Sequence, residues 1–295
     1  MTGIAIIGAT SGPGEALLKR LSGQGHRVMG IGRDAQKMAA VSDACAKAGA
    51  QIPKWMPADV TNHLGLKAAL QSADIVFHCT DPRFVPQVLA ALGDQTEHFI
   101  ALGSTRLFTK YPDRRMKEVG EAERAALAGP VPATMLHPAM IYGDGGETNV
   151  VRIMKYLRLS PVIAMPKGGH SLIQPIYVDD VVSSLVAAWQ RPEARNKSIV
   201  IAGPEPVSYA DFIRSCGRAI GKSVMIIPIP LAVAFALAAV TRIVPGLPAV
   251  AKSEVKRLLE DKNFDVSDMR DILRVSPIGL DDGLQRLVMS LKKPA

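Results

Sequence analysis

The residues between the first apolar run and the first helical pattern could bind a phosphate group. They follow Ile4-Ala5-Ile6-Ile7 and are rich in glycine. Glycines at such a point permit a tight turn and let the backbone approach a pyrophosphate, which the amide end of the next helix attracts. An ordinary strand-to-helix turn is the alternative. The predicted cofactor contacts in this turn are Gly8, Thr10, Ser11, Gly12, Pro13 and Gly14.

The end of the second predicted strand indicates which dinucleotide binds. A carboxylate at this point binds the ribose 2′-hydroxyl of NAD, whereas an arginine accommodates the 2′-phosphate of NADP. Gly32 stands where the acid is expected, and Arg33 follows it. Because a guanidinium forms charge-assisted bonds to phosphate, the sequence predicts NADP(H) as cofactor, with NAD less favoured. Asp34 as a ribose ligand one position later stays open.

Strands and helices alternate through the first half of the chain. This pattern is typical of an α/β protein with a Rossmann-type, doubly wound parallel sheet built from right-handed βαβ units. We expect strands at 4–7, 26–32, 55–60, 74–79, 98–102 and 134–137, and helices at 15–21, 37–48, 63–72, 86–92 and 115–128.

The character of the sequence changes after residue 146, where prolines and glycines become frequent and helical patterns dominate. We expect helices at 149–159, 179–190, 209–220, 231–243, 251–260 and 281–291, with isolated strands at 173–178 and 198–202. The sequence therefore predicts a dinucleotide-binding domain over 1–145. A smaller, mostly helical substrate domain follows over 146–295, and the chain crosses back around 173–202.

Composition excludes several classes of protein. The net charge of +8 is spread along the 295 residues, and no aromatic-rich basic stripe suggests nucleic-acid binding. The cysteines, Cys45, Cys79 and Cys216, lack metal-ligand spacing, so no metal site is expected. They fit a reducing compartment. The N-terminus has no secretory pattern, so we expect a cytoplasmic protein.

Residues 224–240 form the longest apolar stretch. Pro228 and Pro230 divide it and leave a helix shorter than the ~20 residues that span a membrane. A buried domain helix is the first interpretation. The alternative is a peripheral contact with a membrane or a protein through residues 224–243. A membrane contact would make the protein membrane-associated. The oligomeric state cannot be read from the sequence.

Several later segments resemble the short-chain dehydrogenases/reductases, in their extended or atypical branch. Residues 101–105 resemble the strand that ends in the catalytic serine, residues 137–143 resemble the Arg-Pro-x-x-Ile-Tyr-Gly segment beside the nicotinamide, and residues 174–181 resemble the Tyr-Val-Asp-Asp-Val segment. The resemblance implies a catalytic role for Ser104. It also implies further cofactor contacts at Asp59, Val60, Cys79, Thr80, Lys117, His137 and Pro138.

The sequence departs from this family where the reaction takes place. The family uses a tyrosine with a lysine four residues later, and the lysine lowers the pKa of the tyrosine. Lys117 matches the lysine, but Asp113 stands four residues before it, and Tyr111 lies two residues further back. Tyr111 could act from a shifted loop. Asp113, water or the substrate could carry the proton, or the protein could bind its cofactor without turnover.

Three functions follow from these observations. The first is an NADP(H)-dependent oxidoreductase that reduces or rearranges a small or apolar carbonyl or hydroxyl compound. The second is a non-catalytic NADP(H)-binding subunit or sensor, similar to the NADPH-binding accessory subunit of respiratory complex I. The third, a nucleotide-sugar epimerase or dehydratase, is less favoured because Ile173 and Gln174 stand where such enzymes often carry a diphosphate-binding arginine.

Overall fold

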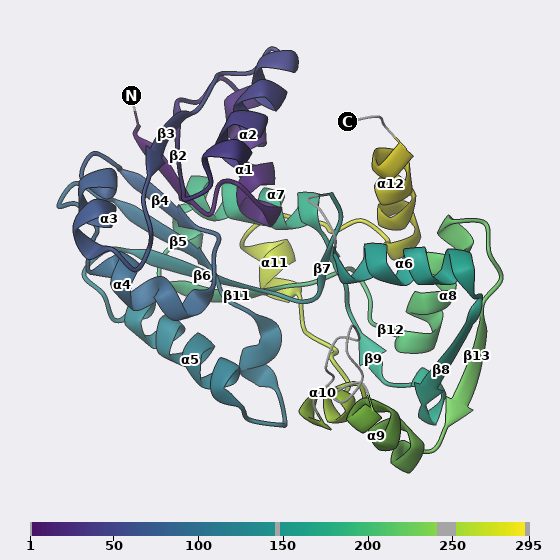
Figure 1. The fold of residues 1–295 in the computed structure, drawn as a ribbon. Coiled ribbons are helices and arrows are strands. Elements are labelled where there is room, and N and C mark those ends of the chain that lie inside the picture. Colours follow the sequence, from purple (N-terminus) through teal and green to yellow (C-terminus); the bar gives the residue numbers. More distant parts are fainter. Residues whose placement is uncertain (1, 145–147, 241–251, 293–295) are drawn as a thin grey trace.

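A seven-stranded parallel sheet forms the centre of the molecule (Figure 1). The computed structural model describes residues 2–144, 148–240 and 252–292. The strand order is β11-β6-β5-β4-β1-β2-β3. The chain adds β2 and β3 on one side of β1 and then β4, β5 and β6 on the other side, which confirms the predicted doubly wound Rossmann-type fold. The strands are β1 (Ile4–Ile7), β2 (Val28–Gly32), β3 (Lys54–Pro57), β4 (Ile75–His78), β5 (His98–Leu102), β6 (Ala133–Pro138) and β11 (Lys197–Ile201).

Two apolar layers cover the sheet, and the alternation of side chains along β1 shows both. Ile4 and Ile6 join the layer under α1 (Gly12–Gly23), α2 (Ala35–Lys47) and α7 (Val178–Gln190). Ala5 and Ile7 point to the opposite layer. That layer lies under α3 (His63–Leu70), α4 (Val85–Leu89) and α5 (Arg114–Leu127). Because both faces are buried, the strands are apolar throughout rather than alternating with polar residues.

The chain returns to the central sheet late in the sequence. After Val178, helix α7 packs against α1, and β11 then pairs in parallel with β6. Trp189 near the end of α7 places its ring edge-on to Phe77 of β4, with the ring centroids 6.4 Å apart. The short helix α11 (Ser267–Asp271) packs on β11. Residues far apart in sequence therefore complete the layer that faces α1.

The other helices and small sheets of the C-terminal half lie beside the central sheet (Figure 1), and they surround a third apolar cluster. Its main helices are α6 (Asn149–Leu159), α8 (Tyr209–Ala219) and α12 (Leu280–Lys292). Three two-stranded sheets join it: β7 (Ile141–Tyr142) with β10 (Ile176–Tyr177), β9 (Leu172–Ile173) with β12 (Val207–Ser208), and β8 (Val162–Pro166) with β13 (Met225–Ile229). The expectation of a mostly helical C-terminal region agrees with this arrangement.

Three features of this half differ from the predictions. The strand expected over 173–178 is split into β9 and β10, because Pro175 between them has no amide to donate to a ladder. The apolar stretch forms strand β13 before helix α9 (Leu231–Val240). Among the described residues β13 pairs with β8 alone, so Pro228 is tolerated there. Helix α10 (Lys252–Arg257) is shorter than expected, and residues 241–251 lie outside the described residues.

Apolar side chains remain exposed over β13 and α9. Met225 is 63% exposed, and Ile227 and Val233 are each 43% exposed. None of the helices in the described ranges is long and apolar enough to cross a membrane. A peripheral contact through residues 224–243 stays a prediction.

Gln174 joins three parts of the fold, and its removal should destabilise the protein. This buried side chain donates to the Gly203 carbonyl at 2.7 Å and accepts from the Phe264 amide at 2.8 Å. Gln174→Ala leaves both backbone groups unsatisfied, so we expect the free energy of unfolding to fall by about 3 kcal/mol in urea denaturation. Gln285→Ala, on the exposed surface of α12, should change it by less than about 0.5 kcal/mol. Equal effects of the two variants would contradict this assignment.

Candidate dinucleotide and substrate site

The glycine-rich turn brings α1 closer to the sheet than any side chain would allow. A Cβ atom at Gly14 would lie 2.3 Å from the Gly8 carbonyl oxygen and 3.1 Å from Cys79 Cβ. Gly8 has φ of 84°, and a Cβ there would lie 2.5 Å from Thr80 Cγ2. Both glycines are therefore required by packing, and they place the N-terminus of α1 beside the ends of β1 and β4.

The start of α1 is open to a ligand. Ser11 is the exposed N-cap residue, and its hydroxyl makes no capping hydrogen bond. Gly12 has φ of 51°, and a Cβ built there would meet nothing within 4 Å. A helix N-terminus with free space before it and an available hydroxyl fits a pyrophosphate. The predicted contacts at Thr10, Ser11, Gly12 and Pro13 thus share one turn at the carboxyl edge of the sheet.

Arg33 and Asp34 have different partners after β2. Asp34 caps α2, where its carboxylate accepts from the Lys37 amide at 3.1 Å. The Arg33 guanidinium lies 3.0 Å from the Asp59 carboxylate and is 76% exposed. Hydrogen bonds from Thr61, and then from Arg33, lower the pKa of Asp59 to about 2. Asp34 is therefore occupied by helix capping, and Arg33 is the charged group held beside the end of β2.

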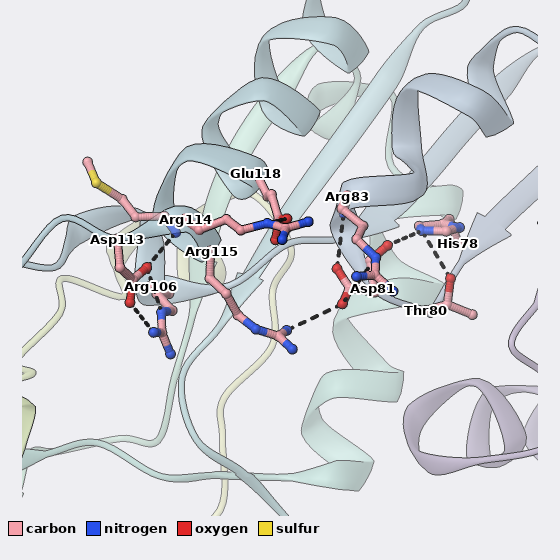
Figure 2. A network of polar contacts seen from close by, with 10 residues as sticks. His78, Thr80, Asp81, Arg83, Arg106, Asp113, Arg114, Arg115 and Glu118 are labelled. Atoms are coloured by element: carbon pink, nitrogen blue, oxygen red, sulfur yellow. Dashed lines mark hydrogen bonds and ion pairs between the residues drawn. The ribbon is translucent and has the colours of Figure 1, made fainter. Parts of the chain in front are cut away.

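Cys79 and Thr80 follow β4 and contact the glycine turn, as predicted for the strand under the cofactor. Burial raises the pKa of the Cys79 thiol to about 12, so the thiol is protonated at neutral pH. Thr80 Oγ1 lies 3.3 Å from His78 Nε2 (Figure 2). Val60 is half-buried against the layer of α3 and α4.

The four predicted catalytic residues do not gather at one point. Ser104 caps the short 3-10 helix Thr105–Phe108, accepts from the Arg106 amide at 3.1 Å, and lines a cavity. Tyr111 is 41% exposed and Lys117 is exposed, and neither lines that cavity. Arg115, two residues before Lys117, reaches Asp81 after β4 at 3.3 Å (Figure 2).

Asp113, at the position of the family tyrosine, is held as a carboxylate. It caps α5 by accepting from the Met116 amide at 3.0 Å, and it accepts from Arg106 Nε at 3.2 Å and from Arg106 Nη2 (Figure 2). The bond from Arg106 is the first cause of a lowered pKa for Asp113. An ionised, paired carboxylate has no proton to donate near neutral pH, which argues against Asp113 as a general acid.

His137 supports Ser104 from within the core. Its side chain is fully buried, with Nδ1 3.2 Å from the Ser104 amide nitrogen and Nε2 3.3 Å from Glu123 Oε1. Gly103 makes room for the ring, since a Cβ there would lie 2.5 Å from Nδ1. Pro138, the next residue, does line the cavity. The buried side chain of His137 lies at the end of β5, so only its backbone could contact a cofactor, and that contact stays a prediction.

A cavity of about 400 Å³ lies between the carboxyl edge of the sheet and the segment around residues 257–264. Ser104, Thr105 and residues 138–140 form its sheet side, and Phe108, Ile173 and Phe264 give it apolar walls. Tyr209 and Lys262, which were not predicted from the sequence, line the same cavity together with residues of the 257–264 segment. No motif marks either residue, because 53 positions separate them and only folding brings them together.

Comparisons with known proteins agree with this architecture. A family model described as "NADP oxidoreductase coenzyme F420-dependent" matches residues 3–101. A mutant UDP-glucuronic acid 4-epimerase from Bacillus cereus, solved with NAD and a fluorinated UDP-sugar, has a TM-score of 0.75 at 17% identity over 99% of each chain. A nucleoside-diphosphate-sugar epimerase from Pseudomonas aeruginosa has a TM-score of 0.75 at 18% identity, over 98% of this chain and 96% of that one. A UDP-glucose 4-epimerase from Thermotoga maritima has a TM-score of 0.73 at 14% identity, over 99% of each chain.

The protein therefore has the fold of these NAD(P)-dependent epimerase-like structures, as the sequence resemblance implied. At identities below 20%, this likeness concerns the fold of the chain. The chemistry has to be argued from the residues of the site.

The buried imidazole of His78 should make stability depend on pH. Burial lowers the pKa of His78 to about 4, against 6.5 for a free histidine. Below pH 6.5 the unfolded chain takes up a proton that the folded protein does not, so stability falls between pH 6.5 and about 4. We expect His78→Gln to reduce this slope by up to about 1.4 kcal/mol per pH unit in urea unfolding. His63→Gln, on the exposed surface, should leave the slope unchanged. An unchanged slope in His78→Gln would argue against a buried neutral ring.

Proposed function

We propose that the protein is an NADP(H)-dependent oxidoreductase that acts on a carbonyl or hydroxyl compound in the cavity beside Ser104. The observation that carries this proposal is the convergence of two features at one edge of the sheet. The glycine turn follows β1, and Ser104 follows β5, so both lie at the carboxyl ends of parallel strands. Ligands of open α/β sheets bind in this crevice, where the strand order reverses.

The residues at the turn fit a nicotinamide dinucleotide. The close contact of Gly14 with Gly8 and the open start of α1 would hold the pyrophosphate, with Cys79 and Thr80 below it. When bound, the reduced cofactor supplies hydride. Arg33 would bind the 2′-phosphate of NADP, since Gly32 offers no carboxylate and Asp34 caps α2.

The chain's own residues suggest how a substrate is held. The Ser104 hydroxyl could donate to a substrate oxygen, because the Ser104 amide donates to His137 Nδ1 and this bond holds the Ser104 backbone in place. Phe108, Ile173 and Phe264 would exclude water from the reacting group and favour a compound with an apolar part. These apolar walls support a small carbonyl compound with an apolar part, and the charged side chains of Arg106, Arg257, Glu260, Asp261 and Lys262 line the same cavity.

Two alternatives have a specific observation each. Full-length similarity to nucleotide-sugar epimerases favours an epimerase. Against it, the buried Gln174 uses its amide for two backbone groups and cannot act as a diphosphate clamp. The ion pair of Asp113 with Arg106 at the family tyrosine position favours a non-catalytic NADP(H)-binding subunit.

A turnover assay separates these functions. Purified protein is incubated with NADPH and a panel of aldehydes and ketones, and separately with UDP-glucose and UDP-glucuronic acid. We expect NADPH oxidation with an apolar carbonyl compound and no conversion of either nucleotide sugar. Ser104→Ala should lower kcat about 100-fold by removing one hydrogen bond to the reacting oxygen, while Ser223→Ala, on an exposed loop, should not. Tight NADPH binding without turnover would favour the non-catalytic alternative.

The cofactor assignment predicts unequal effects on the two dinucleotides. Arg33→Ala should weaken NADPH binding by about 10-fold to 100-fold and NADH binding by less than about 3-fold, because only NADPH carries the 2′-phosphate. Arg27→Ala is a matched control, since Arg27 precedes β2 and lies at the opposite edge of the sheet. Fluorescence titration of each variant gives the dissociation constants. Equal weakening of both cofactors in Arg33→Ala would overturn the 2′-phosphate assignment.

A further inference from the structure

We propose that Tyr209 and Lys262 form the proton-donating pair of the cavity, in place of the Tyr-x-x-x-Lys pair that the sequence lacks. The inference rests on the proposed function, because it concerns the same cavity and the same reduction. The two residues come from α8 and from the segment between α10 and α11. With Ser104 they line one cavity, and a substrate in that cavity would lie beside all three residues.

The hydrogen bond between the two side chains has a defined direction. Lys262 Nζ donates to Tyr209 Oη at 2.7 Å and to the Arg257 carbonyl at 3.1 Å, and it lies 5.2 Å from the centre of the tyrosine ring. Tyr209 Oη is the acceptor, so its own hydrogen points elsewhere. In the described part of the chain this hydroxyl donates to no protein group, which leaves the proton available to a ligand.

Neighbouring backbone groups hold the pair in register. The Tyr209 amide donates to the Ser171 carbonyl at 3.0 Å, and the Lys262 amide donates to the Leu172 carbonyl at 2.9 Å. The Leu172 amide in turn donates to the Asp261 carboxylate at 2.8 Å. Because Ser171 and Leu172 are consecutive, one short segment anchors the backbone of both residues. Such support is what a catalytic pair needs to keep its geometry.

Burial of the pair favours a protonated tyrosine beside an easily deprotonated lysine. Burial, with the Glu260 carboxylate, raises the pKa of Tyr209 to about 12. Burial, with the Arg106 guanidinium, lowers the pKa of Lys262, and Glu260 opposes that shift. Glu260 is itself buried and accepts from Thr109 Oγ1 at 2.9 Å and from the Lys110 amide. Tyr209 is therefore protonated at neutral pH, and the lowered pKa of Lys262 favours proton transfer from its ammonium to a Tyr209 phenolate.

The proposed step balances in protons and electrons. When bound, the cofactor would supply hydride to the carbonyl carbon of the substrate, and the electron pair of the C=O π bond would move to the oxygen. That oxygen forms a bond to the Tyr209 hydroxyl proton, and the Tyr209 O–H bond breaks. The resulting phenolate takes a proton from the Lys262 ammonium, and the neutral amine regains a proton from water. Ser104 would donate a second hydrogen bond to the same substrate oxygen.

The first test reads the coupling of the pair without cofactor or substrate. Competitive acetylation at a series of pH values, followed by peptide mass spectrometry, gives the titration of individual lysines. We expect Lys262 to titrate at lower pH than the exposed Lys222, and Tyr209→Phe to lower the Lys262 midpoint further by removing a hydrogen-bond acceptor of the ammonium. Tyr156→Phe, on the exposed side of α6, should leave it unchanged. A Lys262 titration that matches Lys222 and ignores Tyr209→Phe would overturn the pair.

The second test measures catalysis with the carbonyl compound that the wild-type protein reduces. Tyr209→Phe should lower kcat by about 100-fold or more with the NADPH dissociation constant unchanged, and Lys262→Met should also shift the basic limb of the pH profile. Tyr156→Phe and Lys222→Met should retain activity. Full activity in Tyr209→Phe would overturn the pair and leave the proposed function intact. A wild-type protein that reduces no carbonyl compound would overturn the proposed function and the catalytic role of the pair together.

Discussion

The contact between Gly14 on α1 and the carbonyl of Gly8 is the constraint on which the candidate site depends. At this point the helix approaches the end of β1 to a distance that leaves no room for a side chain. The approach aims the amide end of α1 at the crevice beside β4, where a phosphate-containing ligand would gain from the unpaired amides and the helix dipole. Cys79 and Thr80 close the other side of the same turn.

The C-terminal half is fixed to this framework by buried polar groups that act on backbone. Gln174 joins the loop after β11 to the segment before α11, and the buried carboxylate of Asp180 accepts from the Ile278 amide at 3.0 Å. These bonds determine where the chain that carries Tyr209 and Lys262 passes over the sheet. The substrate cavity is thus made by both halves of the chain, with the sheet edge on one side and residues 257–264 on the other.

The replacement of the family tyrosine by Asp113 changes what α5 can do. Asp113 caps the helix and pairs with Arg106, which stabilises the start of α5 and removes a proton donor from that position. The cavity instead contains a tyrosine and a lysine hydrogen-bonded across 53 positions of sequence. A reductase with this arrangement would keep the cofactor-binding scaffold of its fold and obtain its proton from a different wall of the cavity.

The central sheet, the glycine turn and most helices could be predicted from the order of residues, because they follow from local periodicity and from glycines that a tight turn requires. The same reasoning placed Arg33 at the end of β2. The capping role of Asp34, the splitting of the 173–178 strand and the core position of His137 became visible only in the folded chain. Tyr209 and Lys262 are the clearest case, since neither lies in a motif. Their hydrogen bond exists only because two separate segments anchor to adjacent carbonyls, at Ser171 and Leu172.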